Sequence, residues 1–146
     1  MTDYVTTDEI LTKRVLVIDD EDANLLLIET LLKREGYRNV RCLQDASRAL
    51  DTLIEFDPNI ILLDLMMPEI DGYQLLDMFR RQSRPDAFRP VLVLTADTTL
   101  AARRKALALG AKDFLVKPFD AIEIGLRIAN LLETQILYDR LRSHLS

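Results

Sequence analysis

The segment VLVIDDED (residues 15–22) decides the fold, because a wholly apolar run passes directly into four acidic residues. Both alternating sets of side chains in residues 15–18 are apolar, so this strand must be covered on both faces, which is typical of parallel sheets. The segment IILLD (residues 60–64) repeats the pattern and ends in one aspartate. The two segments predict buried parallel strands with acidic residues at their carboxyl ends.

Strand-sized apolar runs alternate with longer segments of helical spacing along the whole chain. The turn formers Gly36, Pro58 and Gly110 separate helical segments from the strands that follow. The five apolar runs are residues 15–18, 40–43, 60–63, 91–94 and 114–116. Such βα units, repeated with right-handed crossovers, predict a doubly wound α/β sandwich of three layers around a five-stranded parallel sheet.

Composition narrows the class of protein. The 146 residues are 49% hydrophobic and 29% charged, as in a single folded domain. A net charge of −5 gives no general reason to bind nucleic acid or an anionic membrane. Cys42 is the only cysteine, which excludes an internal disulfide, and the sequence shows neither a signal peptide nor an apolar run of about 18 residues. We expect a soluble, cytoplasmic protein with no nucleic-acid or membrane partner.

The last predicted helix is unusually long. It begins at Asp120, carries Glu123 in a capping-box-like start and continues to about Leu145. Its ~26 residues would span roughly 39 Å, about twice a typical strand of ~17–20 Å. In a monomer the overhang would leave apolar groups in water, namely Ile136, Leu137, Tyr138, Leu141 and Leu145. A frayed tail, a homodimer contact and a connector to an output domain are the alternatives.

The residues that follow the strands carry the chemistry. Asp19 and Asp20 follow the first strand, Asp64 the third, Thr95 the fourth and Lys117 the fifth. Ligands of open parallel sheets bind beyond these carboxyl ends, and clustered oxygen ligands without His or Cys favour Mg²⁺ over Zn²⁺. Helix-dipole, turn and counter-ion roles explain each residue separately. Together they supply an anionic nucleophile, a metal site, a cation and a hydroxyl, which suits phosphoryl transfer.

Four motifs in register resemble the receiver domain of two-component response regulators. They are VLVIDDE (residues 15–21), ILLDLMMPEIDG (61–72), LTA (94–96) and GAKDFLVKPF (110–119). The resemblance covers residues 14–132 and implies the flavodoxin-like strand order 2-1-3-4-5. Residues 1–13 are then an N-terminal extension, and residues 133–146 extend the last helix as a dimer contact or a linker to an output domain.

The resemblance also implies a role for each motif residue. Asp64 is the phosphoacceptor in a Mg²⁺-dependent reaction. Asp20 and Asp64 bind the ion directly together with the backbone carbonyl of Met66, whereas Asp19 acts largely through metal-bound water. Lys117 contacts the phosphoryl group.

Two further residues form the switch that the resemblance implies. The hydroxyl of Thr95 turns toward the phosphoryl group, and the Phe114 ring moves inward as Thr95 moves. This remodels the surface formed by the fourth helix, the fifth strand and the fifth helix of the βα series. Phe114 stands where many relatives have Tyr, so no phenol hydroxyl reports the state here. The Lys117–Pro118 peptide bond is expected to be cis.

A sensor histidine kinase or a phosphotransfer protein is the partner that this resemblance implies. The chain is then a regulatory phosphoacceptor domain in a phosphorelay, and not an enzyme beyond its own phosphorylation and dephosphorylation. A haloacid-dehalogenase-like phosphatase is the alternative, but its second aspartate, the general acid and base, is replaced by Met66. A degenerate, unphosphorylated interaction domain is disfavoured because Asp19, Asp20, Asp64, Thr95 and Lys117 are all present.

Overall fold

The computed structural model describes residues 4–67, 70–84 and 87–145. In this part of the chain one parallel sheet has the order β2-β1-β3-β4-β5, which confirms the predicted topology. Its strands are β1 (Arg14–Ile18), β2 (Asn39–Leu43), β3 (Ile60–Asp64), β4 (Val91–Thr95) and β5 (Asp113–Val116). β3 and β4 extend one residue past the apolar runs, so Asp64 and Thr95 end their strands. Pro68 and Glu69 of the second motif lie outside the described residues.

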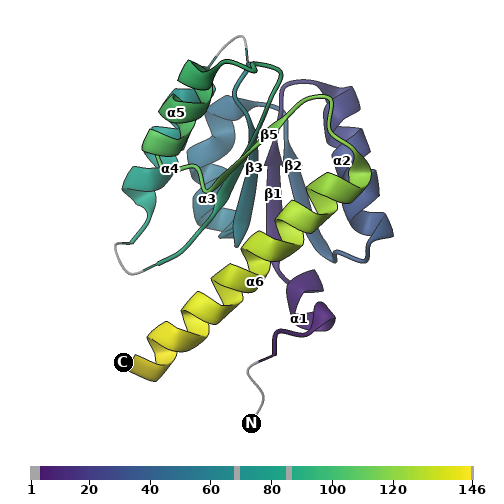
Figure 1. The fold of residues 1–146 in the computed structure, drawn as a ribbon, viewed down its shortest axis with the longest axis vertical. Helices are drawn as coiled ribbons and strands as arrows, with labels where there is room; N and C mark the ends of the chain where they lie inside the picture. The colour runs from purple at the N-terminus through teal and green to yellow at the C-terminus, as the bar shows by residue number, and fades with distance from the viewer. Residues whose placement is uncertain (1–3, 68–69, 85–86, 146) are drawn as a thin grey trace.

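Helices cover both faces of the sheet (Figure 1). Leu16 and Ile18 of β1 face one apolar cluster, whereas Val15 and Val17 face another, as a strand buried on both sides requires. The first cluster lies under α3 (Ala49–Phe56), α4 (Gly72–Gln82) and α5 (Leu100–Ala108), with the short 3₁₀ turn η1 (Ala46–Arg48) leading into α3. The second cluster lies under α2 (Asp22–Arg34) and α6 (Ala121–Leu145).

The helix ends follow local sequence chemistry. Gly36 and Gly110 follow α2 and α5 with φ of 102° and 105°, a conformation that glycine adopts without steric cost. At the start of α6, the Asp120 carboxylate accepts a hydrogen bond of 2.6 Å from the Glu123 N–H. This confirms the predicted start of the last helix. None of the helices within the described residues combines the length and the apolar character needed to cross a membrane.

A short N-terminal helix, which the sequence patterns did not predict, covers part of the α6 overhang. This helix, α1 (Thr7–Leu11), begins with a capping box at Thr6 and lies beside the C-terminal half of α6 (Figure 1). Arg140 of α6 donates to the Tyr4 carbonyl at 2.9 Å and pairs with Glu9. The expectation that Ile136 is exposed is wrong, since it is buried; the rest of the predicted set is exposed, namely Leu137, Tyr138, Leu141 and Leu145.

Removing the Arg140 contacts should release α1 without unfolding the sheet. We expect Arg140→Ala to lower the free energy of unfolding only slightly, because the ion pair with Glu9 is exposed to solvent. Hydrogen exchange should become faster at the amides of residues 7–11. Arg104→Ala, a change at an exposed position of α5, is the control. Unchanged exchange in α1 would show that its apolar contacts suffice.

Candidate functional site

Strand register brings the acidic residues of β1 and β3 together. Ile18 of β1 pairs with Leu63 of β3, so the next residues, Asp19 and Asp64, lie at the same edge of the sheet. Figure 1 shows β1 and β3 side by side in the middle of the sheet. On the other side of β3, β4 and β5 pair so that Lys117 follows the residue opposite Thr95. The carboxyl edge therefore gathers the residues that the motifs singled out.

Three carboxylates and one ammonium group meet at this edge. Asp19, Asp20 and Asp64 each offer an oxygen atom, and these atoms all lie within 4.8 Å of one another. Asp19 and Asp64 are buried, with exposed fractions of 1% and 3%. The Lys117 Nζ lies 3.2 Å from Asp19 Oδ2 and 3.5 Å from Asp64 Oδ2. One cation thus faces three acidic groups, which leaves an excess of negative charge in a buried place.

Backbone amides orient the carboxylates. The Glu21 N–H donates to Asp19 Oδ1 at 3.0 Å, and the Met66 N–H donates to Asp64 Oδ1 at 3.0 Å. Burial raises the pKa of Asp64, an effect that the Met66 amide and Lys117 oppose. The second carboxylate oxygen of Asp64 faces Lys117. Asp64 is therefore held in one orientation, with one oxygen next to the cation.

The donor set fits a hard divalent cation. Asp20 Oδ1 is buried, and no described residue gives it a hydrogen bond. A buried carboxylate oxygen without a donor carries a desolvation cost that a bound cation would remove. The cluster contains oxygen atoms from carboxylates only, which Mg²⁺ prefers. The side chains present here thus fit the magnesium site that the sequence predicts.

Thr95 and Phe114 are buried on the neighbouring strands β4 and β5. Thr95 is fully buried, and its Oγ1 accepts a hydrogen bond of 3.1 Å from the Asp97 N–H. Phe114 is also buried, with 8% exposed, among the apolar residues between the sheet and α5. The Lys117–Pro118 peptide bond is cis, which confirms that prediction.

Two contacts of this site were not predicted from the sequence. A Cβ atom added to Gly72 would lie 2.5 Å from the Leu65 Cα, so the first turn of α4 packs directly on the backbone that follows Asp64. The Gln44 side chain donates to the Asp20 carbonyl at 3.0 Å and supports the loop after β1. Gly72 lies inside a quoted motif, so its position was visible, but the close backbone approach was not.

Comparisons with known proteins agree with this geometry. The family model described as "Response regulator receiver domain" matches residues 15–129. Among curated proteins, the "Probable transcriptional regulator ycf27" of Cyanophora paradoxa is 40% identical over 124 residues, which are 85% of this chain and 50% of that protein. Its namesake in Porphyridium aerugineum is 38% identical over 120 residues, 82% of this chain and 48% of that protein. The chain thus spans about half the length of these curated relatives.

Solved structures show the same fold. The signal receiver domain of a putative Luxo repressor protein from Vibrio parahaemolyticus has a TM-score of 0.81 at 26% identity, covering 89% of this chain and 97% of that one. NtrX from Brucella abortus has a TM-score of 0.80 at 31% identity, covering 92% of this chain and 30% of that one. None of these findings supports the haloacid-dehalogenase-like alternative. This chain belongs to the receiver domain family of two-component response regulators.

Proposed function

We propose that Asp64 is the phosphoacceptor of this receiver domain and that Asp19, Asp20 and Asp64 hold Mg²⁺ beside it. The observation that carries the proposal is the buried cluster of three carboxylate oxygens within 4.8 Å, with the Lys117 Nζ 3.5 Å from Asp64 Oδ2. Asp20, Asp64 and the Met66 carbonyl would hold the ion directly, and Asp19 would hold it largely through water. When bound, the ion neutralises charge on the phosphoryl oxygens.

In the proposed reaction an Asp64 carboxylate oxygen attacks the phosphorus atom of a phosphohistidine. A new P–O bond forms and makes an acyl phosphate of Asp64. The P–N bond breaks, and its electron pair stays on the imidazole nitrogen. The Met66 amide fixes one oxygen of Asp64 at 3.0 Å, so positioning supplies much of the rate. Lys117 stabilises the negative charge that builds up on the phosphoryl oxygens. The same residues serve only the domain's own phosphorylation and dephosphorylation, so its role is regulatory.

Phosphorylation changes the charge next to Thr95 and thereby drives the switch. An acyl phosphate carries about two negative charges where the carboxylate carried one. In this structure the Thr95 hydroxyl oxygen accepts a hydrogen bond from the Asp97 N–H. After phosphorylation the hydroxyl turns and donates a hydrogen bond to a phosphoryl oxygen. The Phe114 ring follows into the space that Thr95 leaves, and the surface of α5, β5 and α6 changes shape. A chemical mark thus shifts the population between two arrangements.

The partners follow from the chemistry and from the length of the relatives. A sensor histidine kinase or a phosphotransfer protein supplies the phosphoryl group. The aligned region covers only about half of the curated relatives, which are named as probable transcriptional regulators, so an output domain connected through α6 receives the signal. A homodimer contact on the same helix is supported by the exposed side chains of Leu141 and Leu145. The receiver itself makes no direct contact with nucleic acid.

Phosphorylation by a small phosphodonor tests the proposal. Incubated with acetyl phosphate and Mg²⁺, the protein should gain the mass of one phosphoryl group by intact mass spectrometry. Asp64→Asn should gain none, because an amide is not a nucleophile for this step. Asp51→Asn, which alters an exposed aspartate of α3, is the matched control and should still be labelled. Labelling of Asp64→Asn, or no labelling of the wild type with Mg²⁺, would contradict the proposal.

A further inference from the structure

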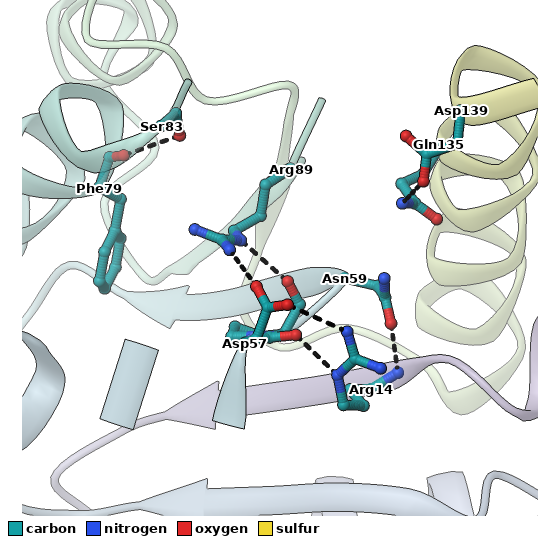
Figure 2. Close-up of polar contacts among 9 residues, drawn as sticks. Arg14, Asp57, Asn59, Phe79, Ser83, Arg89, Gln135 and Asp139 are labelled. Carbon is teal, nitrogen blue, oxygen red and sulfur yellow. Dashed lines mark hydrogen bonds and ion pairs between the residues drawn. The ribbon is translucent and has the colours of Figure 1, made fainter. Parts of the chain in front are cut away.

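A polar cavity of about 390 Å³ lies at the amino-terminal edge of the sheet, opposite the acidic cluster. Its wall includes Arg14 at the start of β1, Asn59 just before β3 and Arg89 just before β4. Gln135 and Asp139 of α6 close it from the other side (Figure 2). The volume falls within the range of small-molecule sites, about 300–1,000 Å³. The cavity has no part in the proposed phosphorylation.

Two guanidinium groups are fixed in this cavity by a single carboxylate. Arg89 donates to the Pro58 carbonyl at 2.8 Å and to Asp57 Oδ1 at 2.6 Å. Arg14 donates to the Asp57 carbonyl at 2.7 Å and lies 3.5 Å from Asp57 Oδ2. Figure 2 shows both arginines converging on Asp57. Each guanidinium has five N–H donors, so donors remain on both after these bonds. The two groups are therefore positioned in advance for a further acceptor.

The lining is more positive than the rest of the chain. Its arginines, Arg14, Arg84, Arg89 and Arg142, outnumber its aspartates, Asp57 and Asp139, by two. The chain as a whole has a net charge of −5. A local excess of positive charge in an acidic protein concentrates anions at that place. Arginine is also the side chain best suited to bind the oxygens of carboxylates and phosphates.

The Gln135 side chain has a buried oxygen that lacks a hydrogen-bond donor among the described residues. Its side chain lines the cavity and is 96% buried, with only 4% exposed. The Gln135 Nε2 donates to Asp139 Oδ2 at 2.6 Å, and this orientation is dictated by chemistry, since a carboxylate only accepts. Gln135 Oε1 is then buried, and no described residue donates to it. This oxygen is closed off from solvent, so an O–H or N–H group supplied from the cavity would satisfy it once the Gln135 side chain has turned.

We propose that this cavity binds a small hydroxylated oxyanion, either a phosphate ester or a carboxylate. The oxyanion accepts hydrogen bonds from Arg14 and Arg89, and the Gln135 side chain turns so that a hydroxyl group of the same molecule donates to its Oε1. Bridging the strand edge and α6, such a ligand would hold the second half of α6 against the sheet. It would do so without touching Asp64, which lies at the opposite edge.

NMR titration of the ¹⁵N-labelled protein in Mg²⁺-free buffer tests this site. Glucose 6-phosphate represents the phosphate source, citrate the carboxylate source and glucose the uncharged control. We expect saturable shifts for at least one of the two anions at the amides of Asn59 and Arg89 and at the Gln135 side-chain amide. Glucose should cause no shift. The anion that binds more tightly identifies the source.

Substitutions distinguish a specific anion-binding site from general electrostatic attraction of anions to the surface. Arg89→Gln should weaken binding at least tenfold, whereas Arg103→Gln, at an exposed position of α5, should leave it unchanged. If Arg89→Gln does not fold, Arg84→Gln at the exposed rim should weaken binding at least threefold. Shifts that do not saturate, shifts centred on Asp64, or equal effects of the cavity and control variants would overturn the proposal.

Discussion

Gly72→Ala is expected to destabilise this protein by about 3 kcal/mol, a large effect for one methyl group. The added Cβ would lie 2.5 Å from the Leu65 Cα and 2.9 Å from the Leu65 carbonyl oxygen. These are backbone atoms, and Leu65 directly follows β3, so neither can move away without displacing the strand end. Either the first turn of α4 or the Leu65 backbone must therefore shift, and a shift of Leu65 also moves the neighbouring Met66 amide that orients Asp64.

Gly125→Ala is the matched control. There the added Cβ would lie 2.5 Å from Glu35 Oε1, but that atom ends an exposed, flexible side chain. The position is inside α6, where alanine is favoured over glycine by about 1 kcal/mol. Urea unfolding followed by circular dichroism should therefore show a lower midpoint for Gly72→Ala and an equal or higher one for Gly125→Ala. Equal midpoints in both variants would refute the backbone clash.

The same pair of variants has a readout at the candidate site. Folded Gly72→Ala, kept at low temperature, should accept phosphate from acetyl phosphate more slowly, because Asp64 is no longer held in place by the Met66 amide. Gly125 lies far along the chain in α6, so Gly125→Ala should be labelled at the wild-type rate. A normal rate in Gly72→Ala would mean that the loop keeps its place despite the added atom.

The sheet could be predicted from the sequence because its evidence is local. Strands apolar on both alternating faces are typical of buried parallel sheets, and the carboxyl ends of such strands share one edge. The motif order then placed Asp19, Asp64 and Lys117 at that edge, where the structure has them.

Contacts between segments remote in sequence could not be predicted from patterns within single segments. Helix α1 is only five residues long, too short for hydrophobic periodicity to reveal, and it is stabilised by packing on α6. Ile136 is buried in the folded chain, which the spacing within the last helix does not reveal, so the prediction for it failed. The cavity lined by Arg14 and Arg89 likewise depends on residues 75 positions apart in sequence, which no periodicity connects.

The Lys117 ammonium group is expected to be the main stabiliser of the unliganded acidic cluster. Lys117→Met removes the one described cation that contacts both Asp19 and Asp64. The two carboxylates are almost fully buried, and breaking a buried ion pair costs about 3–5 kcal/mol. In buffer with a chelator at pH 7.5, we expect Lys117→Met to lower the free energy of unfolding by about 3 kcal/mol. Lys33→Met, which breaks an exposed pair with Glu29, should cost about 0.5 kcal/mol or less.

The pH dependence of this loss has a definite sign. Burial already raises the pKa of Asp64, and Lys117 opposes that rise, so the pKa should be still higher in Lys117→Met. A carboxyl whose pKa is higher in the folded than in the unfolded protein is destabilising above its folded pKa, and the cost fades as pH falls through that value. The stability difference between wild type and Lys117→Met should therefore narrow as the pH is lowered from 7.5 into the acidic range. A constant or widening difference would mean that lost packing, and not charge, explains the effect.

Added Mg²⁺ distinguishes the same two explanations at constant pH. A divalent cation supplies the positive charge that the variant lacks, and any ligand that binds only the folded state stabilises it in proportion to its occupancy. Lys117 competes with the ion for Asp19 and Asp64, so its removal should strengthen Mg²⁺ binding. Saturating Mg²⁺ should then raise the urea midpoint of Lys117→Met more than that of the wild type or Lys33→Met. An equal rise in all three proteins would indicate that Lys117 does not oppose cation binding at this cluster.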